Sequence, residues 1–131
     1  MATTHASVRP ELAAFRESMS LSFPELVERL TAAIGKKLTA YIASVKDVRA
    51  IDRWIAGNEP YGNVDVRLRL AYRVVKMLTD YSEGNRVVQA WLTGLNPELN
   101  DRVPLRLLRE GDPEVVGPEV LAAARAFVAG G

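Results

Sequence analysis

Residues 38–57 read LTAYIASVKDVRAIDRWIAG, and this stretch predicts two short helices that meet at a tight turn. The first helix is expected over about 36–43 and the second over about 48–56. Asp47 is a suitable N-cap for the second helix, and Gly57 is a suitable residue to end it. Two helices joined in this way have the layout of a helix-turn-helix, whose second helix offers its outward side chains to the major groove of DNA.

The second helix is expected to have one face in the core and one in solvent. Three apolar side chains at helical spacing are predicted to point inward: Val48, Ile51 and Ile55. The remaining side chains then point outward or sideways: Arg49, Ala50, Asp52 and Arg53. Trp54 is interpreted as a partly buried packing residue, because a tryptophan on such a helix usually closes the edge of a core.

The rest of the chain also predicts helices, and no segment alternates as a strand would. Residues 1–9 are expected to form a loose tail. Further helices are expected over about 10–20, 23–34, 63–81, 87–94, 104–110 and 118–128, with Ser22 and Glu25 forming a capping box and Gly35 ending the second of them. The predicted fold class is therefore all-α, a compact bundle of seven to eight helices containing the helix-turn-helix, followed by a small helical lobe.

Three of these helices carry apolar faces that are expected to pack against the core. The face of the 10–20 helix consists of Leu12, Phe15 and Met19. The face of the long 63–81 helix consists of Val66, Leu70, Val74, Met77, Leu78 and Tyr81. The face of the last helix consists of Val120, Leu121, Ala124 and Phe127.

Composition argues against catalysis and favours binding. The 131 residues contain no cysteine, which excludes disulfides and thiolate metal sites. The only histidine, His5, falls in the predicted tail, and no glycine-rich phosphate loop is present. No apolar run approaches the roughly 20 residues of a membrane span, and the first residues lack the pattern of a signal peptide. We therefore expect a cytoplasmic binding protein with no catalytic or metal site, no cofactor, no small-molecule substrate and no membrane contact.

Basic residues are concentrated around the predicted helix-turn-helix. The whole chain has a net charge of +1, whereas residues 36–57 hold five basic and two acidic side chains, a net of +3. Arginine forks bind guanine edges and phosphates, and lysines at helix ends suit the passing backbone. The candidate DNA-contacting residues are Lys37, Lys46, Arg49, Asp52 and Arg53. The alternative is a solvated charged surface on a bundle that binds only proteins, since Asp52 would repel phosphate.

Three stretches of the chain resemble one family. Residues 42–57 resemble the helix-turn-helix of the Xre/MbcA/ParS antitoxins, and residues 67–77 resemble the linking helix of that family. Residues 90–108 read AWLTGLNPELNDRVPLRLL and resemble its toxin-binding segment, with Trp-Leu, then Asn-Pro, then Pro-Leu opening a short helix. The resemblance covers roughly residues 23–128.

The resemblance implies an antitoxin that binds a RES-fold, NAD-consuming toxin and also binds the promoter of its own operon. It implies an N-terminal segment over 1–21, a helix-turn-helix domain with its linking helix over 22–82 and a toxin-binding domain over 83–131. A homodimer is expected, because two half-sites of an operator double the DNA contacts. The toxin-facing candidates are Trp91, Asn96, Pro97, Arg102, Pro104, Leu105, Phe127 and Val128.

Two alternatives remain at this point. The chain can be a stand-alone helix-turn-helix DNA-binding regulator without a toxin partner. Residues 91–108 can also have a purely structural role, in which Trp91 packs and Asn96-Pro97 turns the chain.

Overall fold

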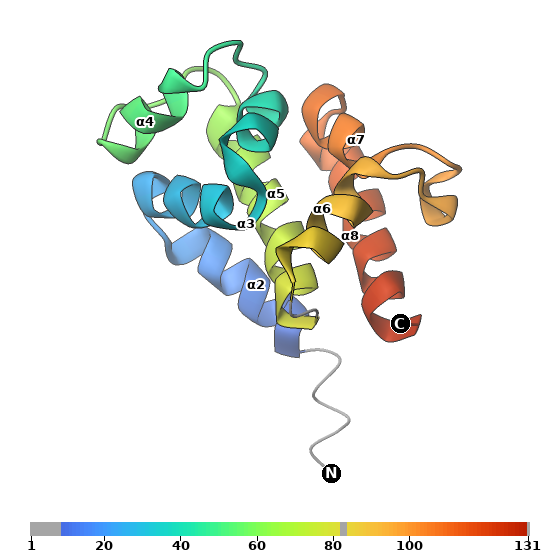
Figure 1. The fold of residues 1–131 in the computed structure, drawn as a ribbon. Coiled ribbons are helices and arrows are strands. Elements are labelled where there is room, and N and C mark those ends of the chain that lie inside the picture. The colour runs from blue at the N-terminus through green and yellow to red at the C-terminus, as the bar shows by residue number, and fades with distance from the viewer. Residues whose placement is uncertain (1–8, 82–83, 131) are drawn as a thin grey trace.

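A computed structural model of the chain describes residues 9–81 and 84–130. Regular structure in these ranges is helical throughout, with seven α-helices, one short 3-10 helix and no strand (Figure 1). The predicted all-α bundle is thereby confirmed. The helices are α2 (Arg9–Ser20), α3 (Phe23–Ala43), α4 (Arg49–Ile55), α5 (Val64–Tyr81), α6 (Asn85–Thr93), η1 (Pro97–Leu99), α7 (Pro104–Glu110) and α8 (Pro113–Gly130). The tail predicted over 1–9, including His5, lies outside the described residues except for Arg9, which begins α2.

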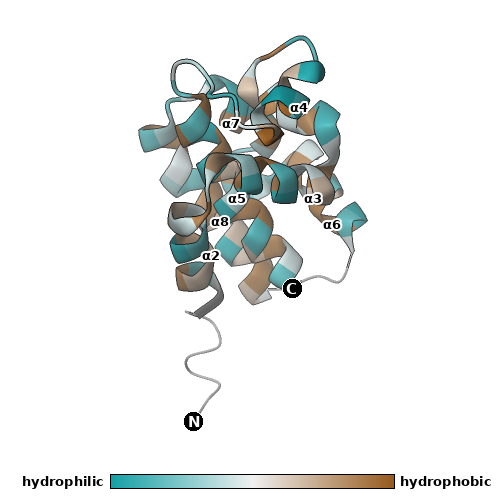
Figure 2. Cartoon of the chain, turned by 90° about the vertical axis from the view of Figure 1, so that its left-hand side faces the viewer, coloured by the Kyte–Doolittle hydropathy of each residue, from teal (hydrophilic) through white to brown (hydrophobic). Residues whose placement is uncertain are grey.

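Helix α5 occupies the centre of the bundle and packs against α2, α3 and α8 (Figure 1). Its predicted core residues Leu70, Val74, Met77 and Leu78 are buried, and so are Leu68, Ala71, Tyr72 and Val75. Because neighbours surround most of α5, its buried residues do not form a single stripe. The prediction was wrong for Val66 and Tyr81, which are exposed near the two ends of the helix. In Figure 2 the helices carry polar and apolar positions side by side, as amphipathic helices around a shared core do.

Two arginines of α5 hold the ends of neighbouring helices. Arg67 donates hydrogen bonds to the carbonyls of Leu108 and Gly111, at 2.9 and 2.7 Å. Arg69 donates to the carbonyls of Ser18 and Leu21, at 2.7 and 2.8 Å. The last carbonyls of a helix have no partner within the helix, so these bonds satisfy the C-terminal ends of α7 and α2. The polar positions of α5 therefore position other helices.

The helix α2 turns a different face to the core than the sequence predicts. Its buried residues are Ala14 and Ser18, whereas the predicted core residues are exposed: Leu12, Phe15 and Met19. Small side chains one turn apart allow α2 to approach α5 closely, and this approach lets the Tyr72 hydroxyl of α5 donate a hydrogen bond to Glu17. Burial, together with this hydrogen bond, raises the pKa of Tyr72 to about 12, so the phenol stays protonated. The apolar stripe of α2 is left on the surface.

Local capping signals place most helix boundaries correctly. The Ser22 hydroxyl accepts a hydrogen bond from the Glu25 amide at 3.3 Å and donates to the Glu25 carboxylate at 3.1 Å, so Ser22 caps α3. Helix α8 begins at Pro113 and not at Pro118 as predicted. The reason is that the Asp112 carboxylate accepts from the Glu114 amide at 3.0 Å and caps the helix early. Pro118 lies on the exposed side of α8, inside the helix.

One hydrophobic core runs through both predicted domains. Leu26 and Leu30 belong to the same buried cluster as Leu92, Leu108 and Val120. The proposed division between residues 82 and 83 stays a prediction, and these two residues lie outside the described part of the chain. Within that part, no helix is both long enough and apolar enough to cross a membrane.

Gly35 interrupts α3 as predicted, with φ 89° and ψ 162°. Only glycine adopts this region readily, and a Cβ at this position would meet no atom within 4 Å. We expect Gly35→Ala to lower the free energy of unfolding by about 1–3 kcal/mol through backbone strain alone. Urea denaturation measures this, with Gly130→Ala as the control, since Gly130 has equally open space but no positive φ. Equal free energies of unfolding for the two variants would show that a side chain at position 35 causes no backbone strain.

Candidate functional site

The first candidate site is the α3–α4 corner, which we define as residues 36–57. The end of α3 is closed by Ser44 in a left-handed conformation, with φ 61°. The Ser44 and Val45 amides donate to the carbonyls of Tyr41 and Ala40, each at 3.1 Å. The Asp47 carboxylate then accepts from the Arg49 amide at 2.9 Å, at the start of α4. The two helices meet at a turn, as the sequence predicts.

Helix α4 is rotated by about one residue from the predicted orientation. Its buried residues are Ala50, Ile51 and Trp54. The prediction was wrong for Val48, which is exposed, and for Ala50, which was expected to point outward. The cause is Trp54, whose ring packs edge-on against Phe23 with centroids 5.8 Å apart. Burying the large Trp54 side chain contributes more free energy than burying Val48 would, so Trp54 decides the orientation of α4. Ile55 remains only half-buried.

All five candidate DNA-contacting residues are exposed, but their charges are not equally free. Arg49 and Asp47 form a salt bridge of 2.7 Å, and the hydrogen bond from Arg49 lowers the pKa of Asp47 to about 2. Lys36 neutralises Asp52 at 2.6 Å. Lys37, Lys46 and Arg53 form no salt bridge with any residue that the structure describes. Asp52 is thus compensated, and three cations remain available.

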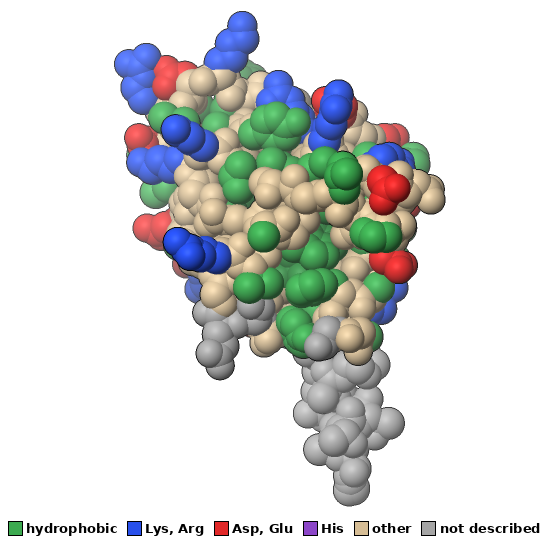
Figure 3. All heavy atoms as spheres, turned by 45° about the vertical axis from the view of Figure 1, so that its right-hand side comes forward, with side chains coloured by type: hydrophobic (Ala, Val, Ile, Leu, Met, Phe, Trp, Pro, Cys, Tyr) green, Lys and Arg blue, Asp and Glu red, His purple; other side chains and the backbone are tan. Residues whose placement is uncertain are grey.

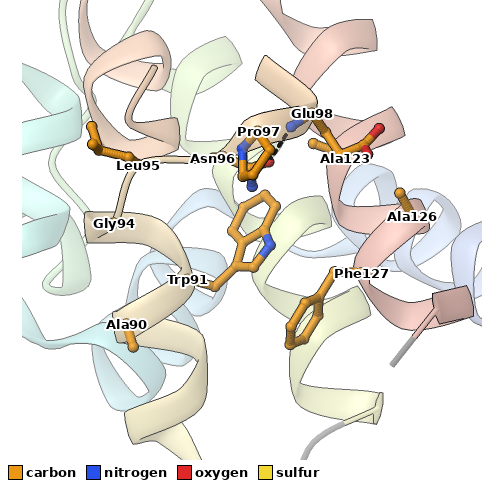
Figure 4. A pocket seen from close by; sticks show the side chains of 10 residues that line it. All are labelled: Ala90, Trp91, Gly94, Leu95, Asn96, Pro97, Glu98, Ala123, Ala126 and Phe127. Carbon is orange, nitrogen blue, oxygen red and sulfur yellow. Dashed lines mark hydrogen bonds between the residues drawn. The ribbon is translucent and has the colours of Figure 1, made fainter. Parts of the chain in front are cut away.

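The second candidate site is a hollow of about 320 Å³ between α6, the loop that follows it and α8. We call it the C-terminal hollow. Ten residues line it, as Figure 4 shows: Ala90, Trp91, Gly94, Leu95, Asn96, Pro97, Glu98, Ala123, Ala126 and Phe127. Two segments that lie 25 residues apart in the sequence therefore meet at this site.

Aromatic rings and one exposed leucine give the C-terminal hollow its apolar character. Trp91 and Phe127 are half-buried and face each other with ring centroids 6.5 Å apart, and Tyr81 packs edge-on against Phe127 at 5.7 Å. Pro97 lies over the Trp91 ring (Figure 4). Leu95 is 73% exposed and points away from Trp91 at the rim. A partner that fills this hollow would bury aromatic and aliphatic surface.

Asn96 holds the loop in place and does not offer its side chain to a partner. It is buried, and its side-chain oxygen accepts from the Glu98 amide at 2.9 Å. Its backbone amide donates to the Arg102 carbonyl at 3.2 Å, and its carbonyl accepts from the Asp101 amide at 2.8 Å. Together with the buried side chain of Leu99, these bonds close residues 96–102 into a fixed loop.

The structure brings four of the eight predicted toxin-facing residues together and separates the others. Trp91, Asn96, Pro97 and Phe127 line the C-terminal hollow. Pro104 and Leu105 do not, because both are buried where α7 begins and have little surface to offer. Arg102 is exposed but pairs with Glu119 at 3.5 Å, and Val128 is half-buried against the core.

Sequence reasoning missed Leu95, Glu98 and the small alanines of the hollow. Leu95 carried a signal, since it is a large apolar residue that directly follows the helix-ending Gly94 and precedes the Asn96-Pro97 turn. Ala123 and Ala126 carried none, because alanine on a helix fits a core and a surface equally well. Among the described residues, no group of three or more His, Cys, Asp or Glu side chains is placed to hold a metal ion.

Comparison of the chain with protein-family models, with curated proteins and with solved structures finds no match.

Replacing Asn96 tests its structural role. Asn96→Ala removes the acceptor for the Glu98 amide, and we expect it to destabilise the fold by about 1 kcal/mol, as loss of a side-chain cap does. Hydrogen exchange of the Leu99 and Asp101 amides should accelerate. Asn96→Asp keeps the acceptor oxygen and should restore most of the protection. Unchanged exchange in the alanine variant would show that the loop is held by other contacts.

Proposed function

We propose that this chain is an antitoxin, a cytoplasmic protein that binds and inhibits a RES-fold, NAD-consuming toxin and acts without catalysis. The observation that carries the proposal is the meeting of Trp91, Pro97 and Phe127 in one hollow. Trp91 and Pro97 come from the stretch that resembles the family's toxin-binding segment, and Phe127 comes from the tail. Their convergence is what a shared binding surface requires.

The surface around the hollow supports a protein partner. Figure 3 shows apolar side chains gathered down the middle of the face formed by the C-terminal helices, with charged side chains toward its edges. Interfaces commonly have such an apolar centre and a polar rim, and tryptophan is among the residues that contribute most to binding. The open shape of the hollow accommodates a side chain or loop of a partner better than an enclosed small molecule.

The position of the hollow suits inhibition. Phe127 lies close to the end of α8, which extends to Gly130. A toxin bound over Trp91 and Leu95 would therefore also meet the C-terminal end of this helix. In the proposal, the end of α8 blocks the entrance to the toxin's active site, so that NAD is excluded.

The α3–α4 corner supports a second role, autoregulation by binding operator DNA as a helix-turn-helix. Lys37, Lys46 and Arg53 are exposed and lack salt-bridge partners among the described residues. Neutralising phosphates with such side chains provides most of the affinity of non-specific DNA binding. The stand-alone DNA-binding regulator is the alternative function, and it is favoured by the same corner. The two proposals differ in whether the C-terminal hollow is needed.

A substitution at the rim of the hollow tests toxin binding. Leu95→Asp places a charge in the apolar surface, and we expect it to weaken the complex with a co-expressed RES-type toxin by at least about 2 kcal/mol, roughly 30-fold in Kd. The matched control is Val115→Asp, because Val115 is 63% exposed but does not line the hollow. Pull-down and rescue of toxin-inhibited growth should both fail for Leu95→Asp only. Absence of any complex with the unaltered chain would leave the stand-alone regulator.

Two substitutions in the α3–α4 corner test DNA binding. Arg53→Ala should weaken binding to the promoter of the operon by about 1–3 kcal/mol if Arg53 contacts a base. Asp47→Asn keeps the oxygen that caps the Arg49 amide but removes the charge that holds the Arg49 side chain. We therefore expect Asp47→Asn to tighten binding and to steepen its salt dependence. Gel shifts over a range of salt concentrations measure both, and equal affinities in all three proteins would refute a DNA-binding corner.

A further inference from the structure

A groove runs between α2 and α8 on the face of the molecule that neither candidate site uses. Both helices pack against α5, which forms the floor of the groove with Val66, Leu70 and Arg73. Arg125 of α8 binds Glu11 of α2 through two hydrogen bonds of 2.9 and 2.7 Å and joins the walls at one end. At the other end the lining residues include Met19, Val66 and Glu114. We call this surface the α2–α5–α8 groove.

The exposed stripe of α2 lies along this groove. Leu12, Phe15 and Met19 recur at helical spacing, all three line the groove, and Met19 is 64% exposed. With Val66, which is 55% exposed, they make four of the ten large apolar side chains that are exposed in the described part of the chain. Monomeric proteins seldom gather exposed apolar side chains in this way without covering them. The exposed apolar side chains of α2 could therefore pack into the same groove on another molecule, as the apolar face of a helix packs into a groove.

Several charged side chains around the groove lack a partner of opposite charge within one molecule. Arg73 lies over the Phe15 ring, 4.8 Å from its centroid, and forms no salt bridge with a described residue. Its Nε atom is buried and has no hydrogen-bond partner there. Arg16 on α2 is exposed, and Glu114 on α8 is exposed and lines the groove. Neither forms a salt bridge with another described residue, so the two wall helices each have an exposed charge without a partner, positive on α2 and negative on α8.

We propose that the α2–α5–α8 groove receives α2 of a second copy of this chain, in a twofold symmetric dimer. A twofold contact uses the same surface on both molecules, so a surface that carries both a stripe and a groove complements itself. Two antiparallel α2 helices place the stripe of each copy in the groove of the other and bring Arg16 toward the partner's Glu114. The exposed apolar side chains become buried, and the two unpaired charges, Arg16 and the partner's Glu114, neutralise each other.

This contact supplies the dimer interface for the homodimer that operator binding is expected to need. The dimer itself does not require bound DNA or bound toxin. The groove contains no residue of the α3–α4 corner or of the C-terminal hollow. A dimer formed here therefore leaves both candidate sites free.

Sedimentation equilibrium of the full chain without DNA tests the proposal. The unaltered protein should have twice the 14.4 kDa of one chain. Met19→Glu should raise the dimer Kd by at least about tenfold, because it would bury an unpaired carboxylate. Tyr61→Glu is the control, since Tyr61 is 92% exposed and lines neither the groove nor the C-terminal hollow, and this variant should remain dimeric. Circular dichroism establishes that both variants keep their helices.

A charge exchange identifies the face independently of apolar burial. Arg16→Glu and Glu114→Arg should each weaken the dimer, and the double variant should restore it toward the original affinity. A monomeric unaltered protein would overturn the proposal and leave the groove to a different partner. A dimer that Met19→Glu and the charge exchange leave unchanged would overturn it as well, because the contact would then lie elsewhere.

Discussion

The burial of α5 on most of its sides is the constraint on which the rest of the structure depends. A helix in this position must satisfy its neighbours with polar groups as well as with apolar ones, and Arg67 and Arg69 do so by bonding the last carbonyls of α7 and α2. These bonds fix where α2 ends and where the chain turns from α7 into α8. The groove and the walls around it follow from the same arrangement, because α2 and α8 are both seated on α5.

Both candidate sites are built on the same hydrophobic core, but different local contacts fix the backbone at each of them. Gly35 redirects the chain just before the α3–α4 corner, and within the corner Trp54 packs α4 against Phe23. At the C-terminal hollow, Asn96 closes a loop whose internal hydrogen bonds keep Pro97 over Trp91. Because binding loses less entropy when a surface is already ordered, both sites are suited to recognise a partner without rearranging. This is consistent with a protein whose proposed roles are all binding roles.

Helix positions could be predicted from the sequence because their signals are local. Ser22, Gly35 and Gly111 act within a few residues of the boundary that each one marks. Helix orientation could not be predicted as well, since it depends on which neighbour approaches and how closely. The apolar stripe of α2 was assigned to the core, whereas Ala14 and Ser18 allow the close contact with α5. The resemblance placed Trp91 and Phe127 in one toxin-facing set, but their direct ring contact could not be predicted from the residues, because only tertiary packing brings these two side chains together.

The two tryptophans of the chain occupy different environments, and this has a practical consequence. Trp54 is buried within the α3–α4 corner, whereas Trp91 is half-buried at the C-terminal hollow. Indole emission shifts with the polarity around the ring, so the molecule carries its own optical reporter of occupancy at the hollow. A ligand seated there would alter the emission of one fluorophore while the other served as an internal reference.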